Sequence, residues 1–384
     1  MLASSLAKRK IDVIVFEEHA DVGLPDHCAG LVNIENFKKI YGVNQKIIKN
    51  TIKGTIIRYG DGQFNLSRNK DEALVIDRPL FDRSLAHKAS KNGADIKLNQ
   101  AVKTIIRKDN VLNILTDRGE IFKGAKLVVN AAGVKALLSR NFNLNNVCRN
   151  PVPALQYDLS PIRDVVRSHV ELYFNNDLTP GFFSWVIPLN EDTARVGLAS
   201  NEADLKLRLK YFIKKTSFNT KRFEKAKITK IRTGLIITGG PAKKTYGNGQ
   251  LLIGDAAGQV KPTTGGGIVT GGICAKIADG IISKSVEDNN FSEVSLSRYQ
   301  LGWKGTLSKE FRYMMYIRNI LNSLDNKSLM KFFKIIAGSQ IAGVLEDKGD
   351  IDFQASAVES TLKRPETLKL LPIITLAFIR YLLL

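Results

Sequence analysis

At the start of the chain, the pattern of apolar and polar positions predicts a helix followed by a buried strand. The helix covers the Ala- and Leu-rich stretch from Leu2 to Lys8, and the strand from Ile11 to Phe16 ends at the acidic Glu17. A strand that follows a helix and ends in a carboxylate is typical of the second half of a βαβ unit that binds a dinucleotide. The Gly-rich turn G-x-G-x-x-G that opens such a unit would precede this helix. We therefore expect a misplaced start codon or a fragment, and weak dinucleotide binding by the chain as it stands.

Between residues 51 and 130 the pattern changes from a hairpin to a helix and then to strands. Alternating positions over 51–68, around the turn Tyr-Gly-Asp-Gly, predict a β-hairpin. A short strand follows, and then a helix that begins at Pro79 and ends at Gly93. Further strands are predicted at 101–106, 111–116 and 126–130.

Residues 151–232 have the pattern of a second, mostly antiparallel domain. Its predicted strands are 152–158, 169–174, 183–189 and 194–199. A strongly basic helix is predicted after them, because 11 Lys or Arg and only two acidic residues occur between Asp204 and Arg232. Such a stretch is usually a solvated face, but it also suits a phosphorylated lipid head group or an anionic membrane.

Residues 250–283 return to strand, Gly-rich turn and helix, and residues 296–384 are predicted to be helical. Pro372 and Arg380 interrupt the apolar tail 367–384, which is therefore too broken for a spanning helix of about 20 residues. The tail is either a buried final helix or one that lies in a membrane interface.

Composition and charge narrow the class of protein. With 384 residues, 44% hydrophobic and 24% charged, the chain can form two or three cores, and disorder is excluded. Cys28, Cys148 and Cys274 are far apart, so we expect reduced thiols and a cytoplasmic protein without a secretory signal. The net charge of +20 implies an anionic partner. Nucleic acid is not predicted as that partner, because the signatures of RNA-binding domains, zinc fingers and basic leucine zippers are absent.

The strongest chemical signal lies between Leu251 and Ile268, in the sequence LLIGDAAGQVKPTTGGGI. An apolar strand brings Asp255 to its carboxyl end, and Gly265 to Gly267 open a helix whose N–H groups face any ligand held there. The pattern predicts a cradle for a flat or sugar-bearing cofactor. The alternative is a structural turn in which Asp255 only caps a helix, and Pro262 with the three glycines argues against it.

With these residues the sequence resembles the geranylgeranyl reductases, flavoproteins of the FAD-dependent superfamily that includes p-hydroxybenzoate hydroxylase. The resemblance covers most of the chain. It rests on Glu17, Cys28-Ala29-Gly30, Asp77-Arg78 with Phe81-Asp82 and Leu85, the segment Pro180 to Pro188, Val196-Gly197, and the run Gly254 to Gly267.

The resemblance implies FAD as the cofactor. In the family, the acidic residue that matches Glu17 holds the adenosine ribose, and the aspartate that matches Asp255 bonds the ribityl chain. The helix that opens near Gly266 and Gly267 would place its positive end near the flavin pyrimidine. The implied cofactor-binding set is Glu17, Arg78, Gly254, Asp255, Gly258, Gly266, Gly267 and Ile268. A chain without the Gly-rich turn is expected to bind FAD poorly.

Two departures from the family pattern affect the predicted chemistry. Ala132 stands where many relatives, above all NADPH-using hydroxylases, carry the acid of an Asp-Gly pair. The electron donor is therefore left open between NAD(P)H and ferredoxin. The family motif Tyr-x-Trp-x-Phe-Pro occurs as Phe183-Ser184-Trp185-Val186-Ile187-Pro188. The resemblance implies an apolar wall for an isoprenoid chain, made of Phe183, Trp185, Ile187 and Pro188; periodicity alone favours an ordinary core strand.

Cys28 lies in a loop that the family folds near the reacting face of the flavin. The resemblance implies that Cys28 is catalytic and that Gly30 is on the substrate side. Without the resemblance, Cys28 would be a small buried apolar residue and the neighbouring His27 a surface or capping group. His19, His87 and His169 have no metal-ligand spacing, and no metal site is predicted.

Taken together, these features predict a two-domain α/β flavoprotein of the glutathione reductase and p-hydroxybenzoate hydroxylase type. A Rossmann-like FAD-binding domain would consist of 1–50, 70–150 and 233–290, an antiparallel β-sheet substrate domain of 51–69 and 151–232, and a helical C-terminal region of 291–384.

The resemblance implies an FAD-dependent reductase that saturates double bonds of geranylgeranyl chains in membrane-lipid biosynthesis, with an isoprenoid lipid as substrate and peripheral membrane contact left open. Two alternatives are an FAD-dependent monooxygenase of the same superfamily and a flavin-free, membrane-associated lipid-binding protein. A quinone-linked flavoprotein is disfavoured, because its iron–sulfur centre needs about four cysteines.

Overall fold

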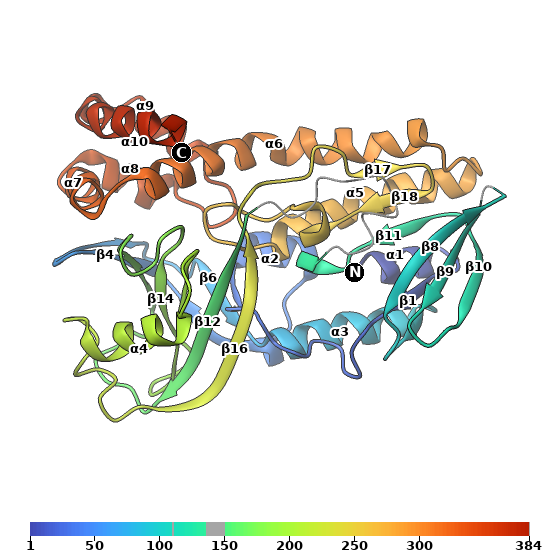
Figure 1. Ribbon diagram of the computed structural model, residues 1–384, viewed down its shortest axis with the longest axis horizontal. Coiled ribbons are helices and arrows are strands. Elements are labelled where there is room, and N and C mark those ends of the chain that lie inside the picture. Colours follow the sequence, from blue (N-terminus) through green and yellow to red (C-terminus); the bar gives the residue numbers. More distant parts are fainter. Residues whose placement is uncertain (110, 136–149, 384) are drawn as a thin grey trace. The chain divides into compact units, whose positions relative to one another are not determined.

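A computed structural model describes residues 1–109, 111–135 and 150–383 (Figure 1). The chain forms two compact units, each assembled from three segments. Unit 1 consists of Met1–Asp26, Asp77–Pro151 and Ile237–Phe311, and unit 2 consists of His27–Ile76, Val152–Ile236 and Arg312–Leu384. Cys148 lies outside the described residues.

The described residues of unit 1 form three small sheets. In the first, β1 (Ile14–Phe16) runs parallel to β7 (Asp95–Lys97). In the second, β11 (Val128–Asn130) runs parallel to β18 (Gln250–Leu252), which pairs with β17 (Tyr246–Gly247). The third is an antiparallel meander of β8 (Val102–Lys108), β9 (Val111–Thr116) and β10 (Ile121–Ala125).

The helices of unit 1 are α1 (Leu2–Lys8), α3 (Arg78–Lys91), α5 (Ile268–Glu287) and the first part of α6 (Glu293–Ser323). Helix α3 begins where the Asp77 side chain accepts a hydrogen bond from the Leu80 N–H, and it ends before Gly93, whose φ of 103° an L-residue rarely adopts. Helix α1 packs on α3 and α5, with Ala7 and Ala89 buried between small side chains.

Unit 2 is built on a sheet of seven strands in the order β16-β12-β15-β14-β13-β4-β5. The bounds along the chain are β4 (Gly54–Tyr59), β5 (Gly62–Ser67), β12 (Pro151–Ser160), β13 (His169–Phe174), β14 (Ser184–Pro188), β15 (Ala194–Ala199) and β16 (Lys227–Ile237). A second sheet has the order β2-β6-β3, with bounds Leu31–Asn33, Ala73–Ile76 and Ile48–Ile52. Helix α2 (Ile34–Tyr41) and the short 3-10 helix η1 (Gln45–Ile47) lie between β2 and β3 in the chain.

Both faces of the seven-stranded sheet are covered by apolar side chains. On β14, Val186 faces a cluster that includes Leu209 and Phe212 of α4 (Leu205–Lys215). Trp185 belongs to a second cluster with residues of the β2-β6-β3 sheet. Because successive side chains of a strand point to opposite faces, one short strand contributes to both cores.

A helical layer completes unit 2. It contains α7 (Asn326–Ala337), α8 (Gln340–Lys348), α9 (Ala355–Leu362), the 3-10 helix η5 (Pro365–Leu370) and α10 (Leu371–Leu383). Ile373 and Ala377 of α10 are buried with Phe333 of α7 and Tyr59 of β4 in one apolar cluster. None of the described helices is by itself long and apolar enough to cross a bilayer. Only α7 and α8 taken together pass that test, as a pair bent by 79°.

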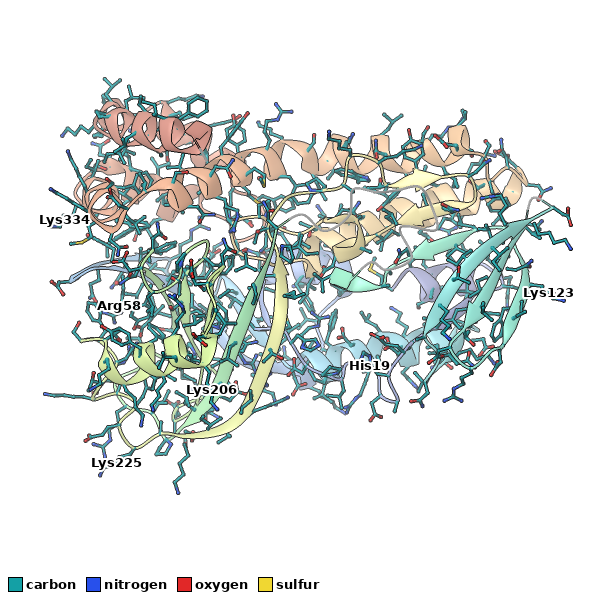
Figure 2. All side chains as sticks on the ribbon, in the orientation of Figure 1. His19, Arg58, Lys123, Lys206, Lys225 and Lys334 are labelled. Carbon is teal, nitrogen blue, oxygen red and sulfur yellow. The ribbon has the colours of Figure 1, made fainter. Side chains whose placement is uncertain are left out.

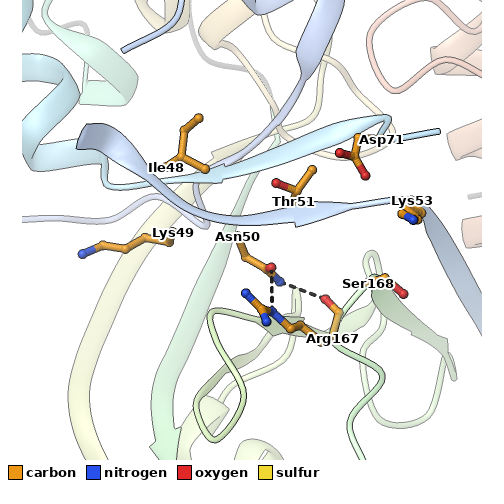
Figure 3. Close-up of a pocket in the computed structure, with 8 residues that line it drawn as sticks. All are labelled: Ile48, Lys49, Asn50, Thr51, Lys53, Asp71, Arg167 and Ser168. Carbon is orange, nitrogen blue, oxygen red and sulfur yellow. Dashed lines mark hydrogen bonds between the residues drawn. The ribbon is translucent and has the colours of Figure 1, made fainter. Parts of the chain in front are cut away.

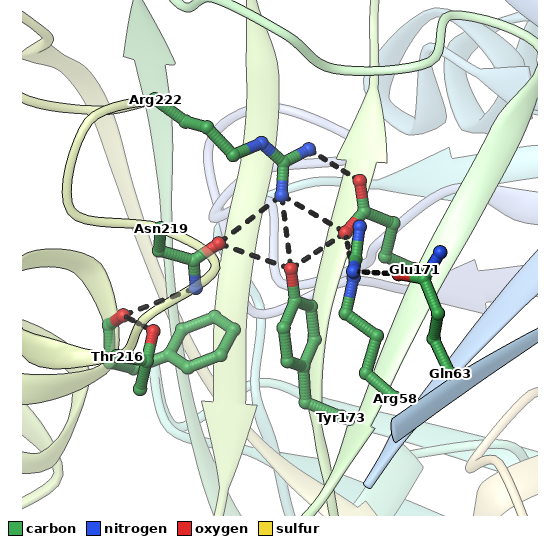
Figure 4. Close-up of polar contacts among 8 residues, drawn as sticks. Arg58, Gln63, Glu171, Tyr173, Thr216, Asn219 and Arg222 are labelled. Carbon is green, nitrogen blue, oxygen red and sulfur yellow. Dashed lines mark hydrogen bonds and ion pairs between the residues drawn. The ribbon is translucent and has the colours of Figure 1, made fainter. Parts of the chain in front are cut away.

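A buried ion network ties α4 and the segment after it to the sheet (Figure 4). The fully buried Glu171 of β13 accepts hydrogen bonds from Arg58 Nε at 2.8 Å, from Arg222 Nη1 at 3.0 Å and from the Tyr173 hydroxyl at 2.6 Å. Burial alone would raise the pKa of the Glu171 carboxyl, but the hydrogen bond and charge of Arg222, the hydrogen bond of Tyr173 and the charge of Arg58 hold it below its ordinary value.

The predicted basic helix from 204 to 232 is wrong in extent and in part of its role. Helix α4 ends at Lys215, residues 216–226 form turns, and β16 begins at Lys227. Lys206 and Lys225 are exposed (Figure 2), but Arg222 and Arg232 are buried in ion pairs. The count of basic residues therefore overstates the charge that this stretch presents to solvent.

The structure also differs from the sequence prediction at several other places. The strand expected from Ile11 forms only at Ile14–Phe16, the three residues that pair with β7. The sheet β2-β6-β3 was not expected, and it places 27–50 and 70–76, which were predicted for the FAD domain, in unit 2. Strand β10 was also missed.

Candidate functional site

In unit 1, the candidate cofactor site is centred on Asp255, at the carboxyl end of β18. The residue belongs to the 3-10 turn η4 (Gly254–Ala257), which follows the strand through Ile253. Its side chain has accessible surface, and yet loss of hydration raises the pKa of the Asp255 carboxyl, while the charge of Arg78 works in the opposite direction. The carboxyl is therefore reachable from solvent, poorly hydrated, and close enough to Arg78 to be affected by its charge.

Glycines keep the space in front of Asp255 free of side chains. At Gly267 a Cβ atom would lie 2.9 Å from Asp255 Oδ1, and at Gly266 it would lie 2.5 Å from Lys261 Cε. Gly254, with φ at 65°, has no heavy atom of another described residue within 4 Å of the Cβ position. A larger residue at 266 or 267 would therefore fill the space in front of Asp255 or displace Lys261.

The N-terminus of α5 supplies hydrogen-bond donors beside Asp255. Helix α5 has no side-chain cap, and no described group accepts a hydrogen bond from the N–H of Gly266 or Gly267. Thr264 Oγ1 is buried and also has no partner among the described residues. Unsatisfied donors at the start of a long helix favour negative charge. The donor set therefore fits a ligand that carries hydroxyls and an electron-rich ring.

Residues that the sequence analysis did not select brace this turn. Gln259 Oε1 accepts the Gly254 N–H at 2.9 Å, and Gln259 Nε2 donates to the Tyr299 hydroxyl at 2.9 Å. The Thr270 hydroxyl donates to the Gln259 carbonyl at 2.6 Å. The available signal was a polar amide directly after Gly-Asp-Ala-Ala-Gly, because a buried amide must find partners.

The remaining predicted cofactor residues of unit 1 have local roles. Arg78 forms an ion pair with Asp82 one turn further along α3. The Glu17 carboxylate, at the end of β1, accepts hydrogen bonds from the backbone N–H and the ring Nδ1 of His19. A Cβ at Gly258 would lie 2.5 Å from the Gly240 carbonyl oxygen, so this glycine is required for packing. Ile268 is the first residue of α5.

In unit 2, a buried charged cluster holds the loop that contains Cys28. Arg195 Nη1 donates to the carbonyls of Cys28 at 3.3 Å and Ala29 at 2.7 Å, while its Nε donates to Asp158 Oδ1 at 2.9 Å. Arg232 lies 2.7 Å from the same Asp158 oxygen. Asp158 and Arg195 are direct partners on β12 and β15. The two strands therefore present a fixed guanidinium to the loop.

Further bonds fix both ends of the same loop. Gln156 Nε2 donates to the His27 carbonyl at 3.0 Å, and His27 Nδ1 contacts the Thr233 carbonyl. Gly30 has a φ of 79°, and a Cβ there would lie 2.5 Å from the Ile76 carbonyl. The Cys28 thiol is half-buried and accepts the Gly30 N–H at 3.3 Å. The loop is thus held by side chains of β12 and β15 and by a backbone carbonyl of β16, and a sequence pattern gives no direct sign of this.

The predicted apolar wall is a packed aromatic cluster in unit 2. Phe183, Trp185 and Ile187 are buried in one cluster, and Ala29 of the Cys28 loop packs against it. The Trp185 indole lies over Gly197, where a Cβ would be 2.6 Å away, and its Nε1 donates to Gln156 at 3.3 Å. Pro188 is not in this cluster; its carbonyl accepts a hydrogen bond from Asn50.

A hollow of about 460 Å³ lies elsewhere in unit 2 (Figure 3). It is open and contains none of the predicted site residues. It is lined by Ile48, Lys49, Asn50, Thr51, Lys53, Asp71, Arg167 and Ser168. No group of three or more His, Cys, Asp or Glu side chains that could hold a metal ion occurs in the described part of the chain.

Relatives of known sequence cover almost the whole chain, although no family model matches it. An uncharacterized protein of Methanocaldococcus jannaschii is 29% identical over 353 residues, which are 91% of this chain and 89% of that protein. The digeranylgeranylglycerophospholipid reductase of the same organism is 28% identical over 381 residues, with 96% and 93% covered. The enzyme of that name from Methanococcus vannielii is 28% identical over 386 residues, with the same coverage.

Solved structures show the same fold. The geranylgeranyl bacteriochlorophyll reductase-like protein of Thermoplasma acidophilum superposes with a TM-score of 0.83 at 22% identity, over 97% of this chain and 95% of that one. A variant of the halogenase PltM in complex with FAD has a TM-score of 0.66 at 13% identity, over 99% and 93%. The predicted fold class and the predicted resemblance to the geranylgeranyl reductases are confirmed. The roles of the individual site residues stay predictions.

Proposed function

We propose that this protein is an FAD-dependent reductase that saturates carbon–carbon double bonds in the geranylgeranyl chains of membrane-lipid precursors. The observation that carries the proposal is similarity over nearly the full chain to proteins named digeranylgeranylglycerophospholipid reductase. The open cradle at Asp255 and the apolar cluster beside the Cys28 loop support it.

FAD fits the residues of unit 1. Asp255 would accept hydrogen bonds from ribityl hydroxyls, and the N–H groups of Gly266 and Gly267 would face the electron-rich edge of the ring. Glu17 would hold the adenosine ribose. When bound, FAD supplies the hydride for one carbon of the double bond.

Unit 2 is proposed to bind the isoprenoid chain. An isolated alkene cannot stabilise a carbanion, so protonation of one carbon must lead or accompany hydride addition to the other. Phe183, Trp185 and Ile187 would exclude water from the carbon that gains positive character. The Cys28 thiol, with its loop fixed by Arg195, would contact the reacting chain.

The reductase proposal is tested by anaerobic incubation of the reduced protein with unsaturated prenyl glycerolipids, followed by mass spectrometry. A ladder of products, each heavier by two hydrogen atoms, is expected. Oxygenated products formed only in air with NADPH would instead identify a monooxygenase. Lipid binding without flavin absorbance or product would identify a lipid-binding protein, and either result would reject the reductase.

The electron donor and the location of the protein are part of the same proposal. Ala132, in place of the family's acid, supports a donor other than a bound nicotinamide, such as a ferredoxin. Stopped-flow reduction of the flavin by NADPH and by reduced ferredoxin separates the two. A lipid substrate and a net charge of +20 support a cytoplasmic protein that works at the membrane surface, which cell fractionation would test.

A further inference from the structure

We propose that the outer face of α10, with the turn before it, docks on an anionic lipid bilayer. This surface, here called the α10 face, consists of Leu368, Leu371, Phe378 and Ile379. Their exposed fractions lie between 48% and 66%. Leu371, Phe378 and Ile379 are spaced so that they fall on one side of the helix.

The exposure of the α10 face does not come from a frayed helix. Ile373 and Ala377, on the opposite side of α10, are almost fully buried. The preceding Leu370 is buried in the same cluster. The helix is therefore anchored to unit 2 along one side while it presents large apolar side chains on the other. Contiguous exposed apolar side chains on an anchored element are typical of a contact surface.

Charge complementarity identifies the occupant as an anionic lipid surface. Lys363, Arg364 and Lys369 are exposed next to the α10 face, and Glu366 is the only acid between 362 and 379. An apolar helix face bordered by basic residues fits the boundary between acyl chains and anionic head groups. In a symmetric contact between two copies of the chain, these cations would oppose one another, which disfavours dimerisation through this face.

Helix α7 offers a basic surface of a different kind. Its Lys327, Lys331 and Lys334 are exposed, on the side of the helix away from the buried Leu329 and Phe333. Lys334 is labelled in Figure 2. The exposed residues on this side of α7 are lysines rather than large apolar side chains. Vesicle binding through these lysines would depend on electrostatic attraction alone. Binding through the α10 face would depend on the insertion of apolar side chains.

The test is co-sedimentation of the full chain with vesicles made of equal parts phosphatidylcholine and phosphatidylglycerol. Phe378→Glu with Ile379→Glu should weaken binding by at least about ten-fold, because two apolar side chains no longer enter the interface. Lys363→Gln with Lys369→Gln should weaken it by about five-fold for each charge removed. Binding should also fall with salt and be weak on phosphatidylcholine alone.

The matched control replaces two apolar residues of α6 that are even more exposed than Phe378 and Ile379, Val294→Glu with Leu301→Glu, whose exposed fractions are 80% and 70%. This control should bind vesicles like the unaltered protein. Equal loss in the control and the α10 variant would overturn the proposal. So would unchanged binding by the α10 variant, or a shift from dimer to monomer in ultracentrifugation without a change in vesicle binding. The substituted side chains are exposed, and circular dichroism confirms that each variant is folded.

The docking proposal goes beyond the proposed reductase activity and can fail separately from it. The vesicles contain no unsaturated prenyl lipid, so binding to them does not depend on catalysis. Turnover of a detergent-dispersed prenyl substrate should be unchanged in the Phe378 and Ile379 variants. Absence of turnover in the unaltered protein would reject the reductase, and absence of vesicle binding would reject the α10 face.

Discussion

Replacing Arg195 by Met should release the Cys28 loop without unfolding unit 2. The substitution removes two hydrogen bonds from a charged donor to the carbonyls of Cys28 and Ala29, each worth about 1.5–3 kcal/mol. Asp158 keeps its ion pair with Arg232, so no buried charge is left alone. The bond to the Cys28 carbonyl is long at 3.3 Å, so we count only the 2.7 Å bond to Ala29 in full and expect loop opening to become easier by about 2 kcal/mol, the value of one such bond.

The assay is the rate at which a thiol reagent labels Cys28. A change of about 2 kcal/mol corresponds to labelling about thirty-fold faster. The experiment uses a Cys148→Ser background. Burial raises the pKa of the Cys274 thiol to about 12, partly offset by its hydrogen bond with Tyr299, so this second thiol should react slowly.

Arg208→Met is the matched control. Arg208 also donates to backbone carbonyls of unit 2, those of Ala203, Asp177 and Leu178, and none of them belongs to the Cys28 loop. Its labelling rate should equal that of the unaltered protein. The labelling rate of Arg195→Lys should lie between those of the unaltered protein and Arg195→Met, because one ammonium group cannot donate hydrogen bonds in the planar arrangement of a guanidinium. If Arg195→Met labels no faster than Arg208→Met, the loop is not held by Arg195.

Four further substitutions test other parts of the structure. Gly267→Ala should weaken FAD binding at least about ten-fold in a fluorescence titration, because its Cβ would lie 2.9 Å from Asp255 Oδ1; Gly280→Ala, which meets no described atom within 4 Å, should bind FAD normally. Asp255→Asn should make the flavin-free protein more stable to urea at neutral pH. Folding raises the pKa of the Asp255 carboxyl, so the unaltered protein loses stability as the pH rises from the carboxyl's ordinary pKa to its folded pKa. Asn carries no such charge. The stability advantage of Asp255→Asn should therefore vanish below pH about 4, where the aspartic acid is protonated in both states. Trp185→Ala should lower turnover of long prenyl chains and keep the flavin content, and loss of flavin with normal turnover would place this residue with the cofactor instead. Glu171→Gln should destabilise the protein by about 3 kcal/mol in urea denaturation, since it leaves the buried Arg222 and the partly buried Arg58 without their counter-charge. The pKa of the Glu171 carboxyl is lowered on folding, so the stability that it contributes to the unaltered protein should disappear as the pH falls below about 4. A difference in unfolding free energy between the two proteins that does not change with pH would contradict this.

The parts of the fold that the sequence predicted are those with strong local signals. The hairpin of β4 and β5 follows from alternation around a Gly-Asp turn, and α3 follows from its Asp77 cap. The short strands β2 and β3 were missed, because each becomes a strand only through pairing with β6. Strands of three and five residues carry almost no periodicity by themselves.

The candidate site was predictable to the extent that its chemistry is contiguous in sequence. Asp255 and the glycines that surround it lie within one motif, and the structure places them together. Arg195 could not be selected, because its role depends on Asp158 across a strand pair and on a loop more than a hundred residues earlier. For the same reason, the count of basic residues wrongly assigned Arg222 to an exposed basic surface. Its partner Glu171 lies on β13, about fifty residues earlier in the chain.

The division of each unit among three segments has a consequence for how the protein can be made. The chain leaves one unit for the other after Asp26, Ile76, Pro151, Ile236 and Phe311, so no single cut in the gene yields either unit intact. Strand β11 pairs with β18, about 120 residues later, which at about 5–20 residues per second takes the ribosome roughly 6–24 seconds. During that interval β11 lacks this partner, and its apolar residues are open to association with other nascent chains. Slower growth at low temperature, or added chaperone, should therefore raise the soluble yield more than any truncation would.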